Sequence, residues 1–236
     1  LLPVLGIRVD AERGLLWVAT ADENNGASEL VSVELESGAV LDRIAAPETV
    51  ASGKRANWHL LNDIAMRRDG ALLITDSDAG CIYERKQGAS ALALVLCDPK
   101  LEFPNGIVLS DDERLAYVAW AGGIAVVDLE TRTWSGIETP PGVNVTGIDG
   151  LYRRGNDLLA VQNGAMLNRV AAFRLAPDGR SVTSEQVLIA NPPAQRLLTT
   201  AALHDADIWL LHFSPWELPH DQWLAPRVLH VQWPVD

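Results

Sequence analysis

An internal repeat constrains the fold of this chain more than any other feature of its sequence. The segments LGIRVDAERGLLWVAT (5–20), NDIAMRRDGALLITDS (62–77) and NGIVLSDDERLAYVAW (105–120) align without gaps. Each contains an apolar strand, a polar turn with Asp, Arg or Gly, and a second apolar strand. DGLYRRGNDLLAVQNG (149–164) is a fourth copy, and TTAALHDADIWLLHF (199–213) is a more divergent fifth copy. Self-similarity of this kind predicts a fold that is built from repeated units.

A second hairpin-like stretch follows the copies of the repeat. These stretches are ELVSVELESGAVLDRI, GCIYERKQGASALALVL, GIAVVDLETRTWSGI and NRVAAFRLAPDGRSVTSEQVLI. Their turns, ESG, KQG, LETR and APDG, are polar and mostly contain Gly, which is typical of connections between antiparallel strands. No segment of ten or more residues has the 3.6-residue apolar period of a helix. The sequence therefore predicts an all-β chain.

The spacing of the copies indicates a β-propeller. Their first strands begin roughly 43 to 57 residues apart, which is the range for four-stranded propeller blades. A β-sandwich would have turns at similar intervals, but it would not explain a four-strand repeat. Five blades are visible, the last copy lacks a clear fourth strand, and the chain does not begin with Met. We therefore expect a six-bladed β-propeller in which residues 1–236 form a single domain that lacks its N-terminal blade.

Composition excludes several classes of partner. The formal net charge is −12, and the sequence contains no cluster of Lys and Arg, so we expect no nucleic-acid partner. No apolar run approaches the roughly 18 residues that span a bilayer, so we expect no membrane partner. The two cysteines, Cys81 and Cys97, lie in neighbouring apolar runs without metal-site spacing, and we expect buried thiols. Compartment and oligomeric state stay open.

The first residue of each repeat copy is a candidate ligand. The innermost strand of a propeller blade lines the central channel, so equivalent first residues converge at one mouth although they lie far apart in the sequence. Three consecutive copies begin with Asn, Asn and Asp, whose side-chain oxygens suit hard cations such as Ca²⁺, Mg²⁺ or Mn²⁺. Any one of them could instead cap a strand end. The five entrance residues are Leu5, Asn62, Asn105, Asp149 and either Thr199 or Thr200.

Three motifs carry a resemblance to a known family. PNGIxLSxDxxxxYVA begins at Pro104, LNDIAxxxDGxLxxTD lies one blade earlier, and GIDGL lies one blade later. In this order they resemble the SMP-30/gluconolactonase/LRE-like family, relatives of the paraoxonases. The resemblance implies a six-bladed propeller that hydrolyses lactones or esters with a divalent cation at the channel mouth. Asn62, Asn105 and Asp149 match three of the family's site residues, whereas Leu5 stands where the first visible blade would have offered the family's glutamate ligand.

The resemblance and the oxygen ligands together suggest a hydrolase of small lactones or related esters. Ca²⁺ is the expected cation, with Zn²⁺, Mn²⁺ or Mg²⁺ as alternatives, and it would polarise the substrate carbonyl and activate water. Asp149 is the family's usual candidate for the base. His59 is a second candidate, because its pKa range suits a base near neutral pH, although it could equally be a packed loop histidine. For Asp63 and Asp76 we expect strand-edge or turn roles.

Two other interpretations stay open. The chain could be a non-catalytic propeller that binds a small molecule or a protein partner, or its metal site could be structural or degraded. GxSxG, GxxxxGK[ST] and GxGxxG do not occur, so a nucleophile-elbow hydrolase and nucleotide binding have no support. Trp216 and Trp223, in a long loop, could form an apolar wall for a substrate or pack onto the last blade.

Overall fold

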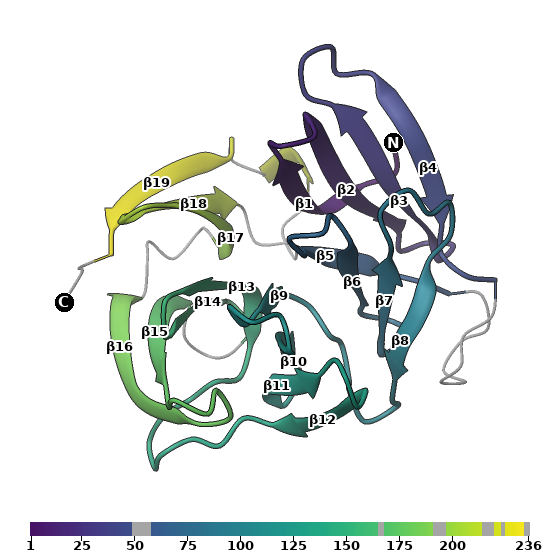
Figure 1. Cartoon of the computed structure of the whole chain (residues 1–236). Helices are drawn as coiled ribbons and strands as arrows, with labels where there is room; N and C mark the ends of the chain where they lie inside the picture. The colour runs from purple at the N-terminus through teal and green to yellow at the C-terminus, as the bar shows by residue number, and fades with distance from the viewer. Residues whose placement is uncertain (49–57, 165–167, 191–196, 214–219, 223–224, 234–236) are drawn as a thin grey trace. The chain divides into compact units, whose positions relative to one another are not determined.

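The computed structural model describes residues 1–48, 58–164, 168–190, 197–213, 220–222 and 225–233 (Figure 1). Its regular elements are β-strands, apart from one 3₁₀ turn at His220–Gln222. The chain divides into two compact units, which are described separately. The first comprises Leu1–Ala121 and Ala125–Ser135, and the second comprises Gly122–Ile124 and Gly136–Asp236. Within the described residues, no helix is both long and apolar enough to cross a membrane.

The first unit contains three antiparallel sheets of four strands, each in sequence order. The strands of the first sheet are β1 (Val4–Asp10), β2 (Leu15–Asp22), β3 (Ala27–Glu34) and β4 (Val40–Ala45). Those of the second are β5 (Leu61–Met66), β6 (Leu72–Asp76), β7 (Cys81–Arg85) and β8 (Ala93–Cys97). The third, which lies in this unit except for a few residues, has β9 (Ile107–Leu109), β10 (Leu115–Trp120), β11 (Gly123–Asp128) and β12 (Thr133–Gly136).

The second unit contains two further sheets. One has four strands, β13 (Ile148–Arg154), β14 (Asp157–Gln162), β15 (Arg169–Leu175) and β16 (Val182–Ala190). The other has three strands among the described residues, β17 (Leu197–His204), β18 (Asp207–Phe213) and β19 (Arg227–Gln232). The prediction of an all-β chain with five propeller-type blades is confirmed. The sixth blade stays a prediction, as does the single domain over residues 1–236.

Side chains that alternate along the strands build a core on each side of a sheet. In β6 every residue is buried. Leu72 and Ile74 belong to the core shared with the first sheet, whereas Leu73 belongs to the core shared with the third. Burial of one such side chain contributes roughly 1.5–3 kcal/mol. Because successive residues point to opposite faces of a strand, the continuous apolar run LLI is what a sheet between two others requires.

Cys81 and Cys97 form a disulfide bond, so the expectation of two free thiols was wrong. The two residues are direct partners in the register between β7 and β8. Neighbouring apolar runs showed that both lie in strands, but they did not show that these strands place the two cysteines opposite each other. The bridge cross-links the two outer strands of the second blade.

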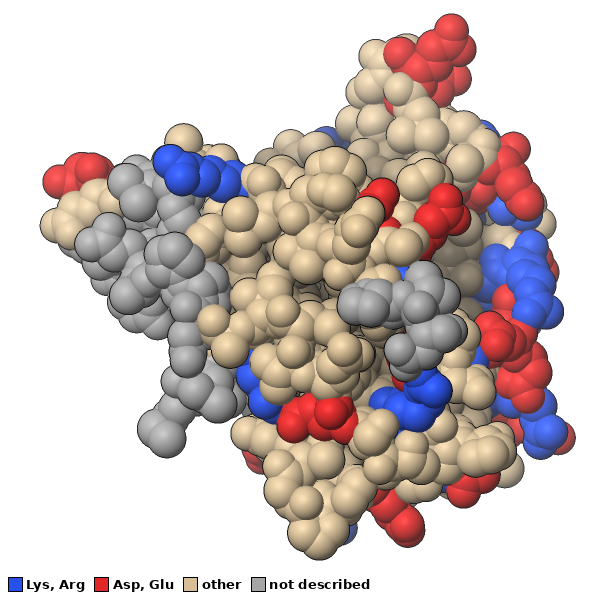
Figure 2. Space-filling model, turned by 90° about the vertical axis from the view of Figure 1, so that its left-hand side faces the viewer, with Lys and Arg blue, Asp and Glu red and all other residues tan. Residues whose placement is uncertain are grey.

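Charged side chains of both signs are interspersed on the surface. On the face drawn in Figure 2 most of the described surface is uncharged, and where Lys and Arg gather, on the right and low in the view, Asp and Glu lie beside them. The acidic surplus of the chain is therefore spread out rather than gathered in one field on this face.

Candidate functional site

A β-bulge opens the inner strand in four of the five blades. In β5, Leu61 pairs with Asp76 but the next pair is Ile64 with Ile74, so two residues of β5 oppose one of β6. Bulges of this kind re-aim side chains at sheet ends. The register shifts at the same place in β1, β13 and β17. The bulged residues are Leu5 in β1, Asn62 and Asp63 in β5, Asp149 and Gly150 in β13, and Thr199 and Thr200 in β17.

The third blade has the corresponding arrangement just before β9. The backbone N–H of Asn105 donates to the Ala119 carbonyl at 2.8 Å, and the Ala119 N–H donates to the Gly106 carbonyl at 2.8 Å. Asn105 therefore lies at the start of its inner strand, and the pairing of Ile107 with Val118 matches that of Ile7 with Val18 in the first blade. The convergence of the predicted ligands at one mouth and their role stay predictions.

Asn62 keeps one polar atom unused. Its Nδ2 donates to Ser77 Oγ at 2.9 Å, and that hydroxyl donates to the Pro104 carbonyl at 2.6 Å. Ser77 thereby joins the entrance of β5 to the residue that precedes Asn105. The Asn62 side-chain carbonyl has no hydrogen bond to any other residue that the structure describes.

The side chain of Asn105 makes fewer hydrogen bonds than that of Asn62. Its backbone is fixed at both polar groups, because its N–H donates to Ala119 and its carbonyl accepts a hydrogen bond from Thr75 Oγ1 at 2.8 Å. The half-buried side-chain amide makes no hydrogen bond within the described part of the chain. Fixed backbone with an unused amide is the arrangement expected of a residue that binds a ligand.

Asp149 lies in the second unit and has a partner there. Asn163 Nδ2 donates to Asp149 Oδ2 at 2.7 Å and to the Leu198 carbonyl at 2.9 Å. Asn163 and Ser77 thus have similar roles, since each follows the second strand of its blade and hydrogen-bonds the carbonyl of the residue before the next entrance residue, Leu198 before Thr199 and Pro104 before Asn105. The sequence reasoning missed both residues, although TDS and VQN place them at equivalent positions of the repeat.

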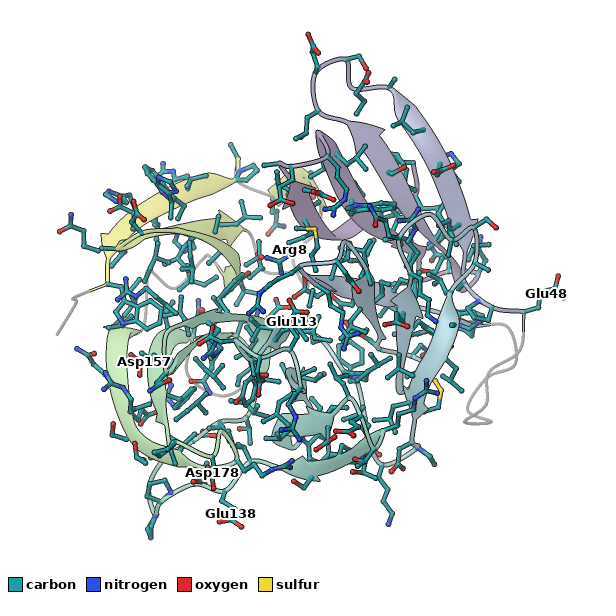
Figure 3. The ribbon with its side chains drawn as sticks, in the orientation of Figure 1. Arg8, Glu48, Glu113, Glu138, Asp157 and Asp178 are labelled. Carbon is teal, nitrogen blue, oxygen red and sulfur yellow. A yellow bond between two sulfur atoms is a disulfide. The ribbon has the colours of Figure 1, made fainter. Side chains whose placement is uncertain are left out.

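Asp63 links neighbouring blades within the first unit, in keeping with the structural role expected for it. Its Oδ2 accepts the Ile107 N–H at 3.0 Å and its Oδ1 accepts the Ile64 N–H at 2.8 Å. Arg8, labelled in Figure 3, donates from Nε to the Ile64 carbonyl at 2.8 Å. Burial raises the pKa of Asp63, an effect that the Arg8 charge and the two N–H donors partly offset.

His59 and Asp76 form a buried pair. His59 Nδ1 lies 2.6 Å from Asp76 Oδ2, and the side chains of His59 and Asp76 are 4% and 0% exposed. Asp76 Oδ1 accepts the backbone N–H groups of Leu60 at 2.9 Å and Ala79 at 3.1 Å. An ionised carboxylate only accepts hydrogen bonds, so a neutral His59 paired with it would carry its proton on Nδ1 and present a lone pair on Nε2. Within the described residues Nε2 is buried without a partner.

The side chains at the strand entrances include oxygen donors that suit a hard divalent cation, but not every blade contributes one. Unused amide oxygens at Asn62 and Asn105 and the carboxylate of Asp149 are oxygen donors of the kind that Ca²⁺ prefers. Leu5 offers none, and Thr200 Oγ1 is hydrogen-bonded to Tyr152 OH at 2.6 Å. Among the described residues no three His, Cys, Asp or Glu side chains are grouped to hold a metal ion, and the predicted set has only one such side chain. Trp216 and Trp223 lie outside the described residues.

Comparison with known proteins supports the fold alone. No family model and no curated protein matches the chain. Among solved structures, Kuenenia stuttgartiensis hydrazine synthase has a TM-score of 0.65 at 16% identity, over 98% of this chain and 63% of that one. A nidogen/laminin complex chain has 0.64 at 14% identity, over 94% and 79%. Inactive H270A virginiamycin B lyase from Staphylococcus aureus with quinupristin has 0.60 at 15% identity, over 89% and 62%.

Proposed function

We propose that this chain is a divalent-metal-dependent hydrolase of small lactones or related esters. The observation that carries the proposal is that Asn62, Asn105 and Asp149 each lie at the entrance of an inner strand. Two of these side chains keep oxygen atoms that no described residue uses. The resemblance of the surrounding motifs to the SMP-30/gluconolactonase/LRE-like family supports the same conclusion.

Asn62, Asn105 and Asp149 would hold the cation through side-chain oxygens. When bound, it would supply polarisation of the substrate carbonyl and a lowered pKa of bound water. Ser77 and Asn163 would orient two of the three ligands, because each hydrogen-bonds an entrance side chain. Ca²⁺ is the cation that this all-oxygen, mostly neutral set fits best, with Zn²⁺, Mn²⁺ or Mg²⁺ as alternatives.

The base that accepts the proton of water is Asp149 or His59. Asp149 has a hydrogen-bonded carboxylate at the entrance itself. His59 has the correct tautomer for a base, because Asp76 holds the proton on Nδ1 and leaves Nε2 to accept. Since His59 is only 4% exposed, it would reach a water only after local opening, and we therefore place Asp149 first.

The six-bladed form of the propeller belongs to the same proposal. The resemblance assigns a glutamate ligand to a further blade, and the entrance of β1 has an apolar residue, Leu5, in place of an oxygen donor. A blade that precedes β1 would supply the missing ligand. Activity that appears only in a longer chain, and that requires a glutamate of the added segment, would support this form.

The second candidate function is a non-catalytic propeller that binds a small molecule or a protein partner. It is favoured by the hydrogen bonds of Ser77 and Asn163, which give Asn62 and Asp149 a purely structural use. On this alternative the entrance polar groups join blades, and any metal serves stability only.

Hydrolysis of a panel of five- and six-membered lactones tests the proposal. Metal-stripped protein would be assayed with Ca²⁺, Mn²⁺, Mg²⁺ and Zn²⁺ beside Asn105→Ala, Asp149→Ala and the control Asn144→Ala, whose side chain holds its own loop. We expect metal-dependent turnover that falls at least a hundredfold in the first two variants only. Turnover that is independent of metal, or equal in all variants, would overturn the proposal.

A further inference from the structure

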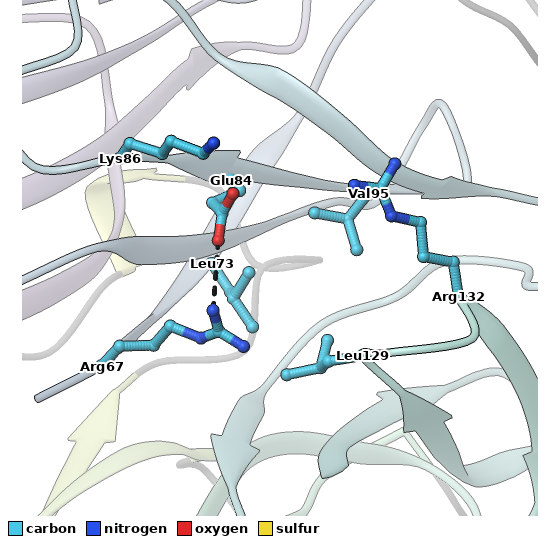
Figure 4. Close-up of a pocket in the computed structure, with 7 residues that line it drawn as sticks. All are labelled: Arg67, Leu73, Glu84, Lys86, Val95, Leu129 and Arg132. Carbon is cyan, nitrogen blue, oxygen red and sulfur yellow. Dashed lines mark hydrogen bonds and ion pairs between the residues drawn. The ribbon is translucent and has the colours of Figure 1, made fainter. Parts of the chain in front are cut away.

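A cavity of about 270 Å³ lies in the first unit, away from the strand entrances. Figure 4 shows it between β6, β7 and β8 of the second blade and the turn that connects β11 to β12. β5 separates it from the entrance, since Arg67 follows the last residue of β5 while Asn62 lies near the first. At about 3.3 Å per residue the two ends of β5 are roughly 17 Å apart. The cavity is lined by Arg67, Leu73, Glu84, Lys86, Val95, Leu129 and Arg132.

The lining of the cavity is cationic, in contrast to the chain as a whole. It contains three basic side chains and one acidic side chain, although the protein has a net charge of −12. Glu84 interacts with Arg67, at 3.4 Å from Oε1 to the guanidinium. The nearby carboxylate of Glu113 is used by Arg68, whose backbone N–H donates to it at 2.8 Å. The lining therefore has two positive charges that no carboxylate of the lining neutralises.

Arg67 has hydrogen-bonding capacity to spare. Its hydrogen bonds to the Glu84 carboxylate and to the Glu113 carbonyl are both long, at 3.4 Å. Its Nε is buried and has no partner among the described residues. A guanidinium has five N–H donors, and a buried donor that is left unpaired costs free energy. A ligand that accepts from Arg67 would recover part of that cost.

Lys86 and Arg132 supply the two unused charges. Figure 4 shows that their side chains extend toward one another from opposite sides of the cavity, with Glu84 and Val95 between them. Neither charged group forms an ion pair or a hydrogen bond with a residue that the structure describes. Both side chains are exposed, so a ligand can reach them from solvent.

The other lining residues are apolar. Leu73, Val95 and Leu129 lie beside the cationic groups, and Leu73 is 1% exposed, so it forms a buried wall. A cavity in which cationic groups surround a few apolar side chains fits a small anion with a short carbon skeleton.

We propose that this cavity binds a small dianionic oxyanion, with its charged oxygens between Arg67, Lys86 and Arg132 and its carbon skeleton on Leu73, Val95 and Leu129. Two net positive charges match a dianion, and planar guanidinium groups bind phosphate and carboxylate oxygens in pairs. The dianion is either a phosphate group or a pair of carboxylates. The inference does not depend on the hydrolase proposal, because it rests on other residues at the other end of the inner strand.

Calorimetric titration with inorganic phosphate, phenyl phosphate and succinate, at ionic strength held constant with NaCl, tests this site. We expect saturable binding of phenyl phosphate or of succinate, weakened about tenfold or more in Lys86→Gln and in Arg132→Gln. Lys100→Gln is the matched control, since Lys100 is exposed in the same unit but does not line the cavity, and its binding should equal that of the wild type.

Each outcome decides the proposal. Saturation by phenyl phosphate identifies a phosphate group, and saturation by succinate identifies a dicarboxylate. Saturation by neither compound overturns the site. Binding that survives unchanged in the double variant Lys86→Gln/Arg132→Gln also overturns it, provided that the thermal midpoint shows the variant to be folded.

Discussion

The entrances of β5 and β13 are built alike but offer a ligand different atoms. Both have a two-residue bulge. In both, the residue after the next strand hydrogen-bonds the entrance side chain and the carbonyl just before the next entrance residue. In β5 the entrance is the neutral Asn62, which donates and keeps its carbonyl oxygen. In β13 the entrance residue is Asp149, whose carboxylate accepts a hydrogen bond from Asn163 and is negatively charged when ionised.

The second bulge residue also differs. In β5 it is Asp63, whose carboxylate is consumed by the N–H groups of Ile107 and Ile64. In β13 it is Gly150, where a Cβ would lie 2.7 Å from Tyr152 OH and 3.2 Å from the Thr199 carbonyl. The two entrances thus share the same bulge. The side chains of the bulged residues determine whether an entrance only links neighbouring blades or also offers oxygen atoms to a cation.

Glycine substitutions next to the two entrances should show the largest effect. A Cβ at Gly6 would lie 2.1 Å from the Asn62 carbonyl, a backbone atom that cannot move alone, so Gly6→Ala should lower the free energy of unfolding by about 3 kcal/mol or more. Gly150→Ala meets the end of a Tyr side chain and should cost about 1–2 kcal/mol. Urea unfolding of both variants checks this. Equal losses of unfolding free energy in the two variants would contradict the expected difference between a clash with backbone and a clash with a side chain.

Removal of the disulfide should rank next. Cys81 and Cys97 are separated by 16 residues, and a loop of this size is stabilised by about 3 kcal/mol through its cross-link. Cys81→Ala/Cys97→Ala should therefore lower the unfolding free energy of the blade that contains β5, without an equal loss for the blade that contains β13. Hydrogen exchange of the two blades measures this, and an equal change in both would be inconsistent with local cross-linking.

Loss of the bridging side chains should have a smaller effect, of similar size in the two blades. Ser77→Ala removes the bonds to Asn62 and Pro104, and Asn163→Ala removes those to Asp149 and Leu198. Each should cost about 1–2 kcal/mol of unfolding free energy. If Asn163→Ala alone abolished metal binding, Asn163 would be an orienting residue rather than only a blade link. Thermal midpoints with and without added Ca²⁺ separate these results.

The pH dependence that comes from Asp63 should be the smallest effect. Because burial raises the folded-state pKa of Asp63 above its ordinary value of 3.8, its contribution is most favourable below that pH and is lost as the pH rises through the raised pKa. Relative to Asp63→Asn, the wild type should lose stability between pH 3 and the raised pKa. Denaturant midpoints over this range test the sign, and a wild type that gains relative to the variant would refute it.

The repeat made the blades and their entrances predictable, because its period and its apolar alternation follow from the chain itself. The repeat could also have predicted Ser77 and Asn163, since they occupy corresponding positions in two of its copies. The pairing of Cys81 with Cys97 was not, because it depends on the register of β7 on β8. The cationic cavity depends on how the third blade packs on the second, which no local pattern records.

The thermal midpoint of metal-stripped protein titrated with Ca²⁺, Mn²⁺, Mg²⁺ and Zn²⁺ tests most directly whether the entrance residues hold a cation. At a hundred times its dissociation constant a cation should add about 2.7 kcal/mol of unfolding free energy. We predict that at least one of these metals raises the midpoint of the wild type and that Asn105→Ala and Asp149→Ala do not respond. A wild type that none of the four metals stabilises, or variants that respond as the wild type does, would contradict the account.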